Sequence, residues 1–261
     1  MIATDKKIAF EARLRACGNV LTLGVRPNFS DYTPYETELI RKAGKIFYPS
    51  TFYADIFNAA GKKIFPSCNN YKFAQDKIRQ TALFNLLNIP HPRTRVFYGK
   101  HQKKSVPDHF GFPFVGKIPR GSAMGRGVYL IRNDEELADL CSLTHIAYVQ
   151  EYLPIDRDMR VVVIGSKVVH AYWRIAAPGE FRTNVALGAS ISLDPLPQNA
   201  LELALHTARV CRWNDVGIDI CEYEGSCYVL EANMKYGKEG FRKAGIDYAR
   251  LMETLIENGE V

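Results

Sequence analysis

Apolar and polar residues alternate along the chain with two periods, near two and near 3.6 residues, and these periods predict strands and helices respectively. The first 73 residues predict short alternating elements, with strands at 21–25 and 45–49 and helices at 34–44 and 52–61. A longer helical spacing at 73–87 ends before Ile89 and Pro90, where the chain must extend. This alternation predicts a small α/β layer at the start of the chain.

Strand patterns dominate the middle of the chain. They lie at 93–98, 112–118, 127–131 and 147–152, and a helix at 133–143 opens at Asn133. Beyond them, Gly165 and Ser166 join strands at 159–164 and 167–173 into a hairpin, and helices are predicted at 199–211 and after Gly245. The sequence therefore predicts an α+β fold, of α/β type in its first part.

A second predicted hairpin carries acidic residues. Its strands, 217–223 and 227–233, face each other across a three-residue loop, Glu224 to Ser226, which places Asp219 directly against Glu231. Because side chains alternate with period two, each strand then separates apolar from polar residues. One face is expected to carry Ile218, Ile220, Leu230 and Ala232, and the other Asp219, Glu231 and Asn233.

Two directly opposed carboxylates repel each other unless a positive charge neutralises them. Two carboxylates and an amide suit Mg²⁺ that is shared with substrate phosphates, so Asp219, Glu231 and Asn233 are candidate metal ligands. The alternative is an acidic hairpin end with lysine or arginine partners. The pattern alone leaves both interpretations open.

A glycine-rich connection is the second chemical feature. Lys117 ends one predicted strand and Val128 opens the next, with Gly121, Gly125 and Gly127 between them. Such a loop lets backbone N–H groups approach phosphate oxygens, while the lysine supplies a mobile charge. It is not a Walker loop, because the GK[ST] ending is absent and a strand follows where a helix should begin. A flexible connection without a ligand is the alternative.

Composition limits the class of protein. The 261 residues are 47% hydrophobic and 24% charged, which is ordinary for a globular chain. The net charge of +6 is spread along the chain without a basic block, so an anionic small molecule explains it as well as nucleic acid does, and we do not expect a nucleic-acid partner. The six cysteines form no CxxC pair, and neither a signal peptide nor an 18-residue apolar run is present. We therefore expect a soluble cytoplasmic protein with reduced thiols and no membrane contact, and a homo-oligomer is compatible with the sequence.

Six separated motifs are more informative together, in their order along the chain, than any of them is alone. They are Asp76-Lys77 on an early helix, Lys117 with its glycine loop, YVQEYLP, DMRVVVI, GEFRTN, and GIDI with LEAN. In this order they resemble the ATP-grasp superfamily, most closely its RimK-like branch of ribosomal-protein glutamate ligases, from about Phe73 to the C-terminus. The resemblance implies an ATP-grasp fold with three parts: a short N-terminal α/β region at 1–73, a linker helix and small lid subdomain at 74–152, and a C-terminal antiparallel-sheet subdomain at 153–261.

The resemblance also implies an ATP site. Lys77 and Lys117 match the two lysines that hold the nucleotide phosphates, and Gly121 to Gly127 match the loop that folds over them. The hinge beside the adenine and the position near the ribose are matched by Gln150, Glu151, Tyr152, Leu153 and Asp158.

The catalytic positions follow from the same comparison. Arg160 and Arg174 match basic positions aimed at phosphate or at the carboxylate to be activated, and Arg182 and Asn184 match the pair that steadies the transferred phosphoryl group. The metal ligands of the family fall on Asp219, Glu231 and Asn233, in agreement with the hairpin argument. The implied cofactors are ATP and Mg²⁺, with two ions expected and Mn²⁺ as a substitute.

The implied activity is that of an ATP-dependent carboxylate–amine ligase that forms an acyl phosphate and joins a carboxylate to an amine, such as an amino acid or peptide. A non-catalytic ATP-binding protein with a regulatory or partner-binding role is the alternative. Both lysines and all three metal ligands are retained, which favours the enzyme. Departures from the branch at Leu187, Lys235 and Tyr236 lie on the substrate side, so they are expected to change substrate specificity more than nucleotide binding.

Overall fold

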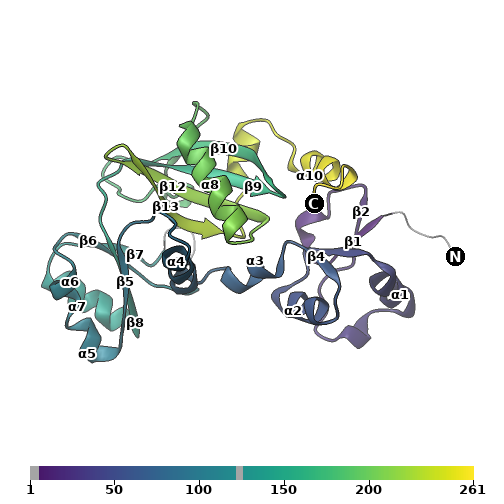
Figure 1. Ribbon diagram of the computed structural model, residues 1–261, viewed down its shortest axis with the longest axis horizontal. Coiled ribbons are helices and arrows are strands. Elements are labelled where there is room, and N and C mark those ends of the chain that lie inside the picture. The colour runs from purple at the N-terminus through teal and green to yellow at the C-terminus, as the bar shows by residue number, and fades with distance from the viewer. Residues whose placement is uncertain (1–5, 122–125) are drawn as a thin grey trace.

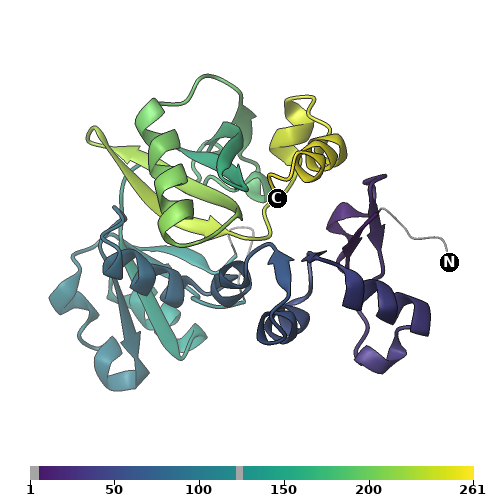
Figure 2. The same ribbon diagram turned by 45° about the vertical axis from the view of Figure 1, so that its right-hand side comes forward.

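The computed structural model describes residues 6–121 and 126–261, and these form three sheets with helices packed around them. Figures 1 and 2 show the sheet of the N-terminal region on one side of the molecule, the largest sheet in the middle, and the third sheet on the other side. The predicted mixture of helices and sheets is therefore confirmed. Each sheet lies within one of the three predicted segments, whose boundaries stay a prediction.

The N-terminal sheet is parallel, in the order β2-β1-β3-β4. Its strands are β1 (Lys7–Ala9), β2 (Val20–Thr22), β3 (Lys45–Phe47) and β4 (Lys63–Phe65). The helices of this region are η1 (Ala12–Leu14), η2 (Phe29–Asp31), α1 (Pro34–Lys42) and α2 (Thr51–Ala59). The two predicted helices are confirmed, but the sequence missed β1 and β4. All four strands of this sheet are only three residues long, and apolar spacing identified just β2 and β3.

The helix expected at 73–87 is two helices, α3 (Cys68–Phe73) and α4 (Lys77–Leu86). Between them Gln75 has a φ of 56°, which breaks the helical path. Asp76 then caps α4, because its carboxylate accepts a hydrogen bond from the Arg79 N–H at 3.0 Å. The prediction of one continuous helix was wrong, and the break makes Lys77 the first residue of α4.

The third sheet is antiparallel, in the order β5-β8-β6-β7. Its strands are β5 (Thr94–Tyr98), β6 (Phe114–Lys117), β7 (Val128–Ile131) and β8 (Ile146–Glu151). Its helices are α5 (Gly99–Lys103), α6 (Val106–His109) and α7 (Asp134–Leu143). As predicted, Asn133 caps α7, accepting from the Glu136 N–H at 2.9 Å. A separate core that includes Phe97, Phe114 and Leu140 makes this sheet a packing unit of its own.

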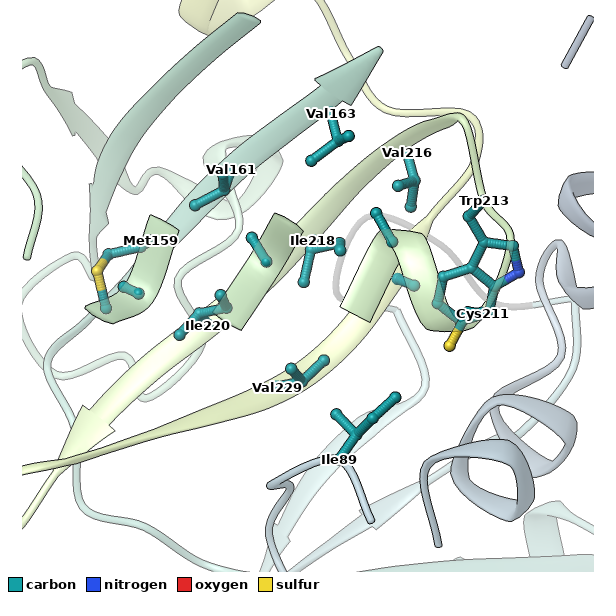
Figure 3. Close-up of a cluster of buried hydrophobic side chains, with 14 of the residues drawn as sticks. Ile89, Met159, Val161, Val163, Cys211, Trp213, Val216, Ile218, Ile220 and Val229 are labelled. Atoms are coloured by element: carbon teal, nitrogen blue, oxygen red, sulfur yellow. The ribbon is translucent and has the colours of Figure 1, made fainter. Parts of the chain in front are cut away.

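The largest sheet is antiparallel, in the order β11-β10-β9-β12-β13. Its strands are β9 (Arg157–Ile164), β10 (Lys167–Ile175), β11 (Ser190–Ser192), β12 (Asp215–Tyr223) and β13 (Ser226–Asn233). The 3₁₀ helix η3 (Val185–Leu187) precedes β11, and helix α8 (Gln198–Val210) covers one face of the sheet. Figure 3 shows Val161, Val163 and Ile218 on that face, within the core that α8 closes.

Strand β9 is buried on both faces. Val161 and Val163 belong to the core under α8, whereas Val162 and Ile164 belong to a second core on the opposite face. This explains why the strand reads as a nearly unbroken apolar run rather than an alternating one.

The second core joins the two ends of the chain. It combines residues of the N-terminal layer, such as Leu14 and Phe47, with Met252 and Leu255 of the last helix. The C-terminal helices are α9 (Glu239–Lys243) and α10 (Tyr248–Glu257), and Figure 1 shows α10 beside β1 and β2. Across the described ranges, no helix combines the length and apolar character that a membrane span needs.

A buried polar cluster ties the N-terminal layer to the largest sheet. Asp215, at the start of β12, is fully buried and accepts hydrogen bonds from the hydroxyls of Tyr48 at 2.7 Å and Tyr236 at 2.5 Å. The Arg13 guanidinium lies 4.4 Å from the Tyr236 ring centroid and donates to the Tyr248 hydroxyl at 3.0 Å. Burial raises the pKa of the Asp215 carboxyl despite the nearby charge of Arg13.

Tyr48→Phe is expected to destabilise the protein by about 1.5–3 kcal/mol, the usual contribution of a hydrogen bond to a charged group. The substitution keeps the ring and removes only the hydroxyl that donates to Asp215. Urea unfolding of wild type and variant measures the change. Tyr35→Phe is the matched control, because the Tyr35 side chain is exposed and its substitution should leave the midpoint unchanged. Equal midpoints for Tyr48→Phe and wild type would show that the bond contributes nothing.

Candidate active site

The hairpin of β12 and β13 places Asp219 opposite Glu231, as the sequence predicted. The predicted three-residue loop is wrong, since Tyr223 pairs with Ser226 and the turn has only two residues. Both have positive φ, 49° at Glu224 and 75° at Gly225, the conformation that matches the twist of a hairpin. A register shift between Asp219 and the next residue then compensates for the shorter turn.

The same register shift changes the faces of β13. Ile220 pairs with Val229 instead of Leu230, so the prediction that Leu230 lies on the apolar face with Ile220 is wrong. Val229 and Ala232 enter the core under α8, whereas Leu230 lines a cavity on the other face beside Glu231. The hairpin therefore presents an apolar side chain next to its carboxylates.

Asp219 is neutralised by basic side chains. Arg160 makes a two-pronged contact with its carboxylate, and Arg174 Nη2 lies 2.9 Å from its Oδ2. The Asn233 amide also donates to this Oδ2, at 3.1 Å. Burial opposes ionisation of Asp219, but the charges of Arg160 and Arg174 outweigh it and hold the pKa of this carboxyl below its ordinary value. These contacts match the alternative interpretation of the hairpin, in which its acidic residues have lysine or arginine partners.

A second carboxylate extends this charge cluster. Arg174 Nε donates to Asp158 Oδ1 at 2.7 Å, and both side chains are buried. Burial raises the pKa of Asp158 even with Arg174 beside it. The hydroxyl of Thr183 donates to the same carboxylate, a contact that the sequence did not reveal. Its only signal was the position of Thr183 inside the FRTN motif.

Helix α4 brings a lysine to the other carboxylate of the hairpin. Lys77 Nζ lies 3.1 Å from Glu231 Oε1, and the Lys77 side chain is almost fully buried. Gln80, one turn along α4, donates to the Ala232 carbonyl at 2.8 Å and accepts from the Ala232 N–H at 3.1 Å. This pair of hydrogen bonds fixes the helix against β13 and so sets the distance between Lys77 and Glu231.

Lys117 occupies the matching position at the end of β6. Its Nζ donates to Gln150 Oε1 at 2.7 Å, and the Gln150 amide donates to Thr94 Oγ1 at 3.0 Å. Burial lowers the pKa of Lys117 to about 8, although the charge of Glu231 opposes the shift. Among the residues that the structure describes, its hydrogen-bond partner is a neutral amide, so this buried lysine is ready to take an anionic partner.

Two adjoining cavities collect the predicted side chains. The first encloses about 710 Å³, open mouth included, and the predicted residues confined to it are Lys117, Gln150, Glu151, Tyr152, Leu153, Asp158 and Arg182. The second encloses about 1190 Å³, and those confined to it are Lys77, Arg160 and Asn233. The residues common to both are Val128, Arg174, Asn184, Asp219 and Glu231.

The first cavity also has apolar walls that the sequence did not predict. They come from residues scattered along the chain: Pro92, Val115, Ile155, Phe181 and Leu230. No local pattern links these positions, because they converge only when β6, β13 and the segment after β8 come together. The cavity thus combines apolar walls with charged side chains such as Lys117 and Arg174, a composition that suits an aromatic ligand with an anionic tail.

The glycine loop adjoins the second cavity. Gly121 and Gly127 have φ of 69° and 70°, and a Cβ on Gly127 would lie 2.9 Å from the Ile118 side chain, so this site excludes larger residues. Gly125 lies outside the described residues. Arg126 lies inside the loop and lines the second cavity, a role that no sequence pattern indicated. Lys77 N–H donates to the Pro119 carbonyl at 3.1 Å, which attaches the loop to α4.

Two of the predicted site residues, Glu151 and Arg182, already have polar partners. Glu151 Oε1 accepts from the Arg93 N–H at 2.5 Å, and Arg182 Nη2 lies 2.6 Å from Glu180 Oε2. Hydrogen bonds from Arg182 hold the pKa of Glu180 at about 2. Both residues still line the first cavity.

The β12–β13 hairpin offers carboxylate and amide oxygens, the kind of ligand that a hard divalent cation prefers. Within residues 6–121 and 126–261, no three His, Cys, Asp or Glu side chains are grouped to hold a metal ion. The candidate set is instead two carboxylates and an amide, Asp219, Glu231 and Asn233, the oxygen chemistry that Mg²⁺ accepts when phosphates complete its shell. Asp219 would exchange part of its arginine contact for such an ion.

A family model described as the RimK-like ATP-grasp domain matches residues 74–256. The chain belongs to the RimK-like ATP-grasp family. This confirms the family that the order of the motifs indicated. Curated relatives in the family include a probable alpha-L-glutamate ligase of Pseudomonas aeruginosa, 33% identical over 195 residues that cover 70% of this chain and 64% of the relative.

Another relative is the ribosomal protein bS6–L-glutamate ligase of Escherichia fergusonii, 32% identical over 193 residues, with the same 70% and 64% coverage. The chain thus spans less than two thirds of the length of these relatives. The RimK domain ATP-grasp protein of Sphaerobacter thermophilus has a TM-score of 0.69 at 15% identity, covering 96% of this chain and 99% of that one. This similarity confirms the ATP-grasp fold.

Proposed function

We propose that this chain is an ATP-dependent carboxylate–amine ligase of the ADP-forming type. The observation that carries the proposal is the junction of the two cavities, where Arg174, Asn184, Asp219 and Glu231 line both. A group transferred from a ligand in one cavity to a ligand in the other must pass this point. Family membership and the names of the relatives support the same reaction class.

The first cavity is assigned to ATP. Its apolar walls, including Leu230 and Ile155, would enclose the adenine, and Lys117, which lines the same cavity, would bind phosphate oxygens. Lys77, at the start of α4, lies beside Glu231, which lines both cavities. The second cavity is assigned to the carboxylate and amine substrates, because it lies beyond the charged junction and carries the loop after β13.

The reaction needs positioned charges rather than a nucleophilic side chain. A substrate carboxylate oxygen attacks the γ-phosphorus of ATP and ADP leaves. The amine nitrogen then attacks the acyl carbon, inorganic phosphate leaves, and an amide forms with loss of a proton. A magnesium or manganese ion held by Asp219, Glu231 and Asn233 would neutralise the negative charge of the phosphates. Arg160 and Arg174 lie against Asp219, where their remaining N–H groups can hold the transferred phosphoryl oxygens.

The proposal is tested by ADP and phosphate release with pooled amino acids and small carboxylic acids. A ligase releases ADP only when both substrates are present, and mass spectrometry then shows the amide. A non-catalytic nucleotide-binding protein would bind Mg-ATP, but it would release no ADP in response to an added amine. That second outcome would replace the ligase with the regulatory alternative.

Nucleotide affinity should depend on pH because of Lys117. Its folded pKa of about 8 lies below the ordinary value of 10.5, so free Lys117 loses its proton as the pH rises through 8. Mg-ATP binding should therefore weaken above pH 8, and binding near pH 8 to 9 should take up a proton. Calorimetry in two buffers of different ionisation enthalpy measures the uptake. Affinity that is flat between pH 7 and 9 would contradict the expectation.

The lowered pKa of Lys117 also makes the stability of the folded protein depend on pH. Between pH 8 and 10.5 the unfolded chain holds the Lys117 proton and the folded chain does not, so this group makes the folded state more stable as the pH rises through that window. Below pH 8 the buried charge costs stability, which bound nucleotide would offset.

A further inference from the structure

One wall of the second cavity is the segment that follows β13, together with the start of α9. The residues that line the cavity from this wall are Lys235, Tyr236, Gly237 and Glu239, and all four are confined to the second cavity and do not reach the first. The hydroxyl of Tyr236 donates to the buried Asp215, which holds the segment in place. This wall therefore lies on the side assigned to the carboxylate and amine substrates.

Helix α9 is held close against β10. A Cβ on Gly240 would collide with the ring of Tyr172, a buried residue that also lines the second cavity, so the helix approaches the strand as closely as a glycine allows. The next residue, Phe241, is fully buried, and its ring centroid lies 4.9 Å from that of His170. These contacts fix the start of α9 and with it the place of Glu239 at the cavity.

The Glu239 carboxylate is folded back over the segment after β13. A Cβ on Gly237 would collide with Glu239 Oε2, so the glycine leaves the room that this carboxylate occupies. On its other side, Glu239 Oε1 lies 2.9 Å from Arg242 Nη2, and the two side chains are 48% and 73% exposed. An exposed ion pair contributes little to stability, so Glu239 can exchange Arg242 for a cationic ligand at little cost.

The charges of the second cavity point to the same carboxylate. Its acidic residues are Asp219, Glu231 and Glu239. Asp219 and Glu231 are the proposed metal ligands, and each already lies against a basic side chain. The phosphoryl group and the acid substrate have basic partners in this cavity: Lys77, Arg126, Arg160, Arg174 and Lys235. Within the described part of the cavity wall, Glu239 is thus the acidic group left for a cationic substrate.

Lys235 is the basic residue that shares this wall with Glu239. Its Nζ lies 3.8 Å from Glu11 Oε1, and it also lines a third cavity whose opposite wall is the N-terminal layer. Lys235 is therefore paired with a carboxylate outside the second cavity, which leaves the Glu239 carboxylate to a substrate.

We propose that Glu239 holds the amine substrate as its ammonium ion at this wall of the second cavity. The inference rests on the proposed ligase function and adds the place where the amine binds before it attacks the acyl phosphate. It limits the amine to one that is protonated in solution, such as the amino group of an amino acid, a peptide or an alkylamine. Because Glu239 is half exposed, water reaches the bound ammonium and can take the proton that the nitrogen must lose before it attacks.

A competition between two nucleophiles tests this assignment. The purified full chain receives Mg-ATP, a pool of amino acids, alkylamines and small carboxylic acids, and hydroxylamine, which is uncharged at neutral pH. Hydroxylamine attacks the acyl carbon, inorganic phosphate leaves, and a hydroxamate forms with loss of a proton, whereas the amine substrate forms an amide. Mass spectrometry measures the ratio of amide to hydroxamate.

Glu239→Gln is expected to lower this ratio about tenfold, the lower end for a charge-assisted contact, because the side chain is half exposed. Hydroxamate should still form at the wild-type rate, since the uncharged nucleophile does not need the carboxylate. Gly237→Ala keeps the charge of Glu239 but displaces its carboxylate, so it should lower the ratio as well. Glu38→Gln is the matched control, because Glu38 is 50% exposed in a helical ion pair with Lys42, and it should leave the ratio unchanged.

A ratio that stays unchanged in Glu239→Gln, whether both products persist or both decline, would overturn the inference. Hydroxamate without any amide in the wild-type reaction would also overturn it, and would leave the ligase function standing because the acyl phosphate had formed. If the wild-type chain forms neither product, the ligase function itself is overturned, and the inference with it.

Discussion

Glu231→Gln is expected to lower Mg²⁺-dependent turnover by about 10³-fold or more while leaving the fold intact. Glu231 lies at the junction of the two cavities, opposite Asp219 and 3.1 Å from Lys77 Nζ. Glutamine keeps the size of the side chain and removes its negative charge, so the site loses one of the two carboxylates that would hold the cation. Losing one preorganised charge from a transferring-phosphate site costs a factor of this order.

The measurement is kcat for ADP release in the purified variant, with circular dichroism to confirm folding. Glu222→Gln is the matched control, because Glu222 is an exposed carboxylate on the same hairpin and should leave kcat unchanged. If Glu231→Gln turns over at the wild-type rate with Mg²⁺, the hairpin is a structural acidic pair with basic partners and the metal site must be placed elsewhere.

Lys117→Met is expected to weaken Mg-ATP binding about ten- to a hundredfold, the value of a charge-assisted contact of ~1.5–3 kcal/mol. The nucleotide-free variant should nevertheless be at least as stable as wild type. Burial depresses the pKa of Lys117, which means that its charge destabilises the empty protein, and methionine fills the same space without a charge. Opposite effects on binding and stability distinguish a ligand-binding lysine from a structural one.

Calorimetry with Mg-ATP and thermal unfolding of the free protein provide the two measurements. Lys104→Met, on the exposed surface of the same sheet region, serves as the control and should change neither. Wild-type affinity in Lys117→Met would remove this lysine from the nucleotide site. A large loss of stability together with a loss of affinity would mean that the Lys117 to Gln150 bond supports the fold.

Local patterns predicted much of the fold. The helices α1, α2, α7 and α8 were predicted from their apolar spacing, α7 also from its cap at Asn133, and the β9–β10 hairpin from Gly165 and Ser166. The three-residue strands β1 and β4 were missed, whereas β2 and β3, which are equally short, were predicted. The division between α3 and α4 was also missed. It depends on the backbone of Gln75 and the cap by Asp76, which helical spacing does not record.

The candidate site shows the same contrast. By itself the sequence determined the family, the positions of the two lysines, and the opposition of Asp219 and Glu231, because each depends on residue order or on pairing between adjacent strands. Only the tertiary structure decided that Arg160 and Arg174 neutralise Asp219, that Leu230 leaves the core, and that the N-terminal layer closes a cavity beside Lys235. The physical reason is that these contacts join side chains far apart in the chain, whose approach is set by packing of whole elements and not by any local period.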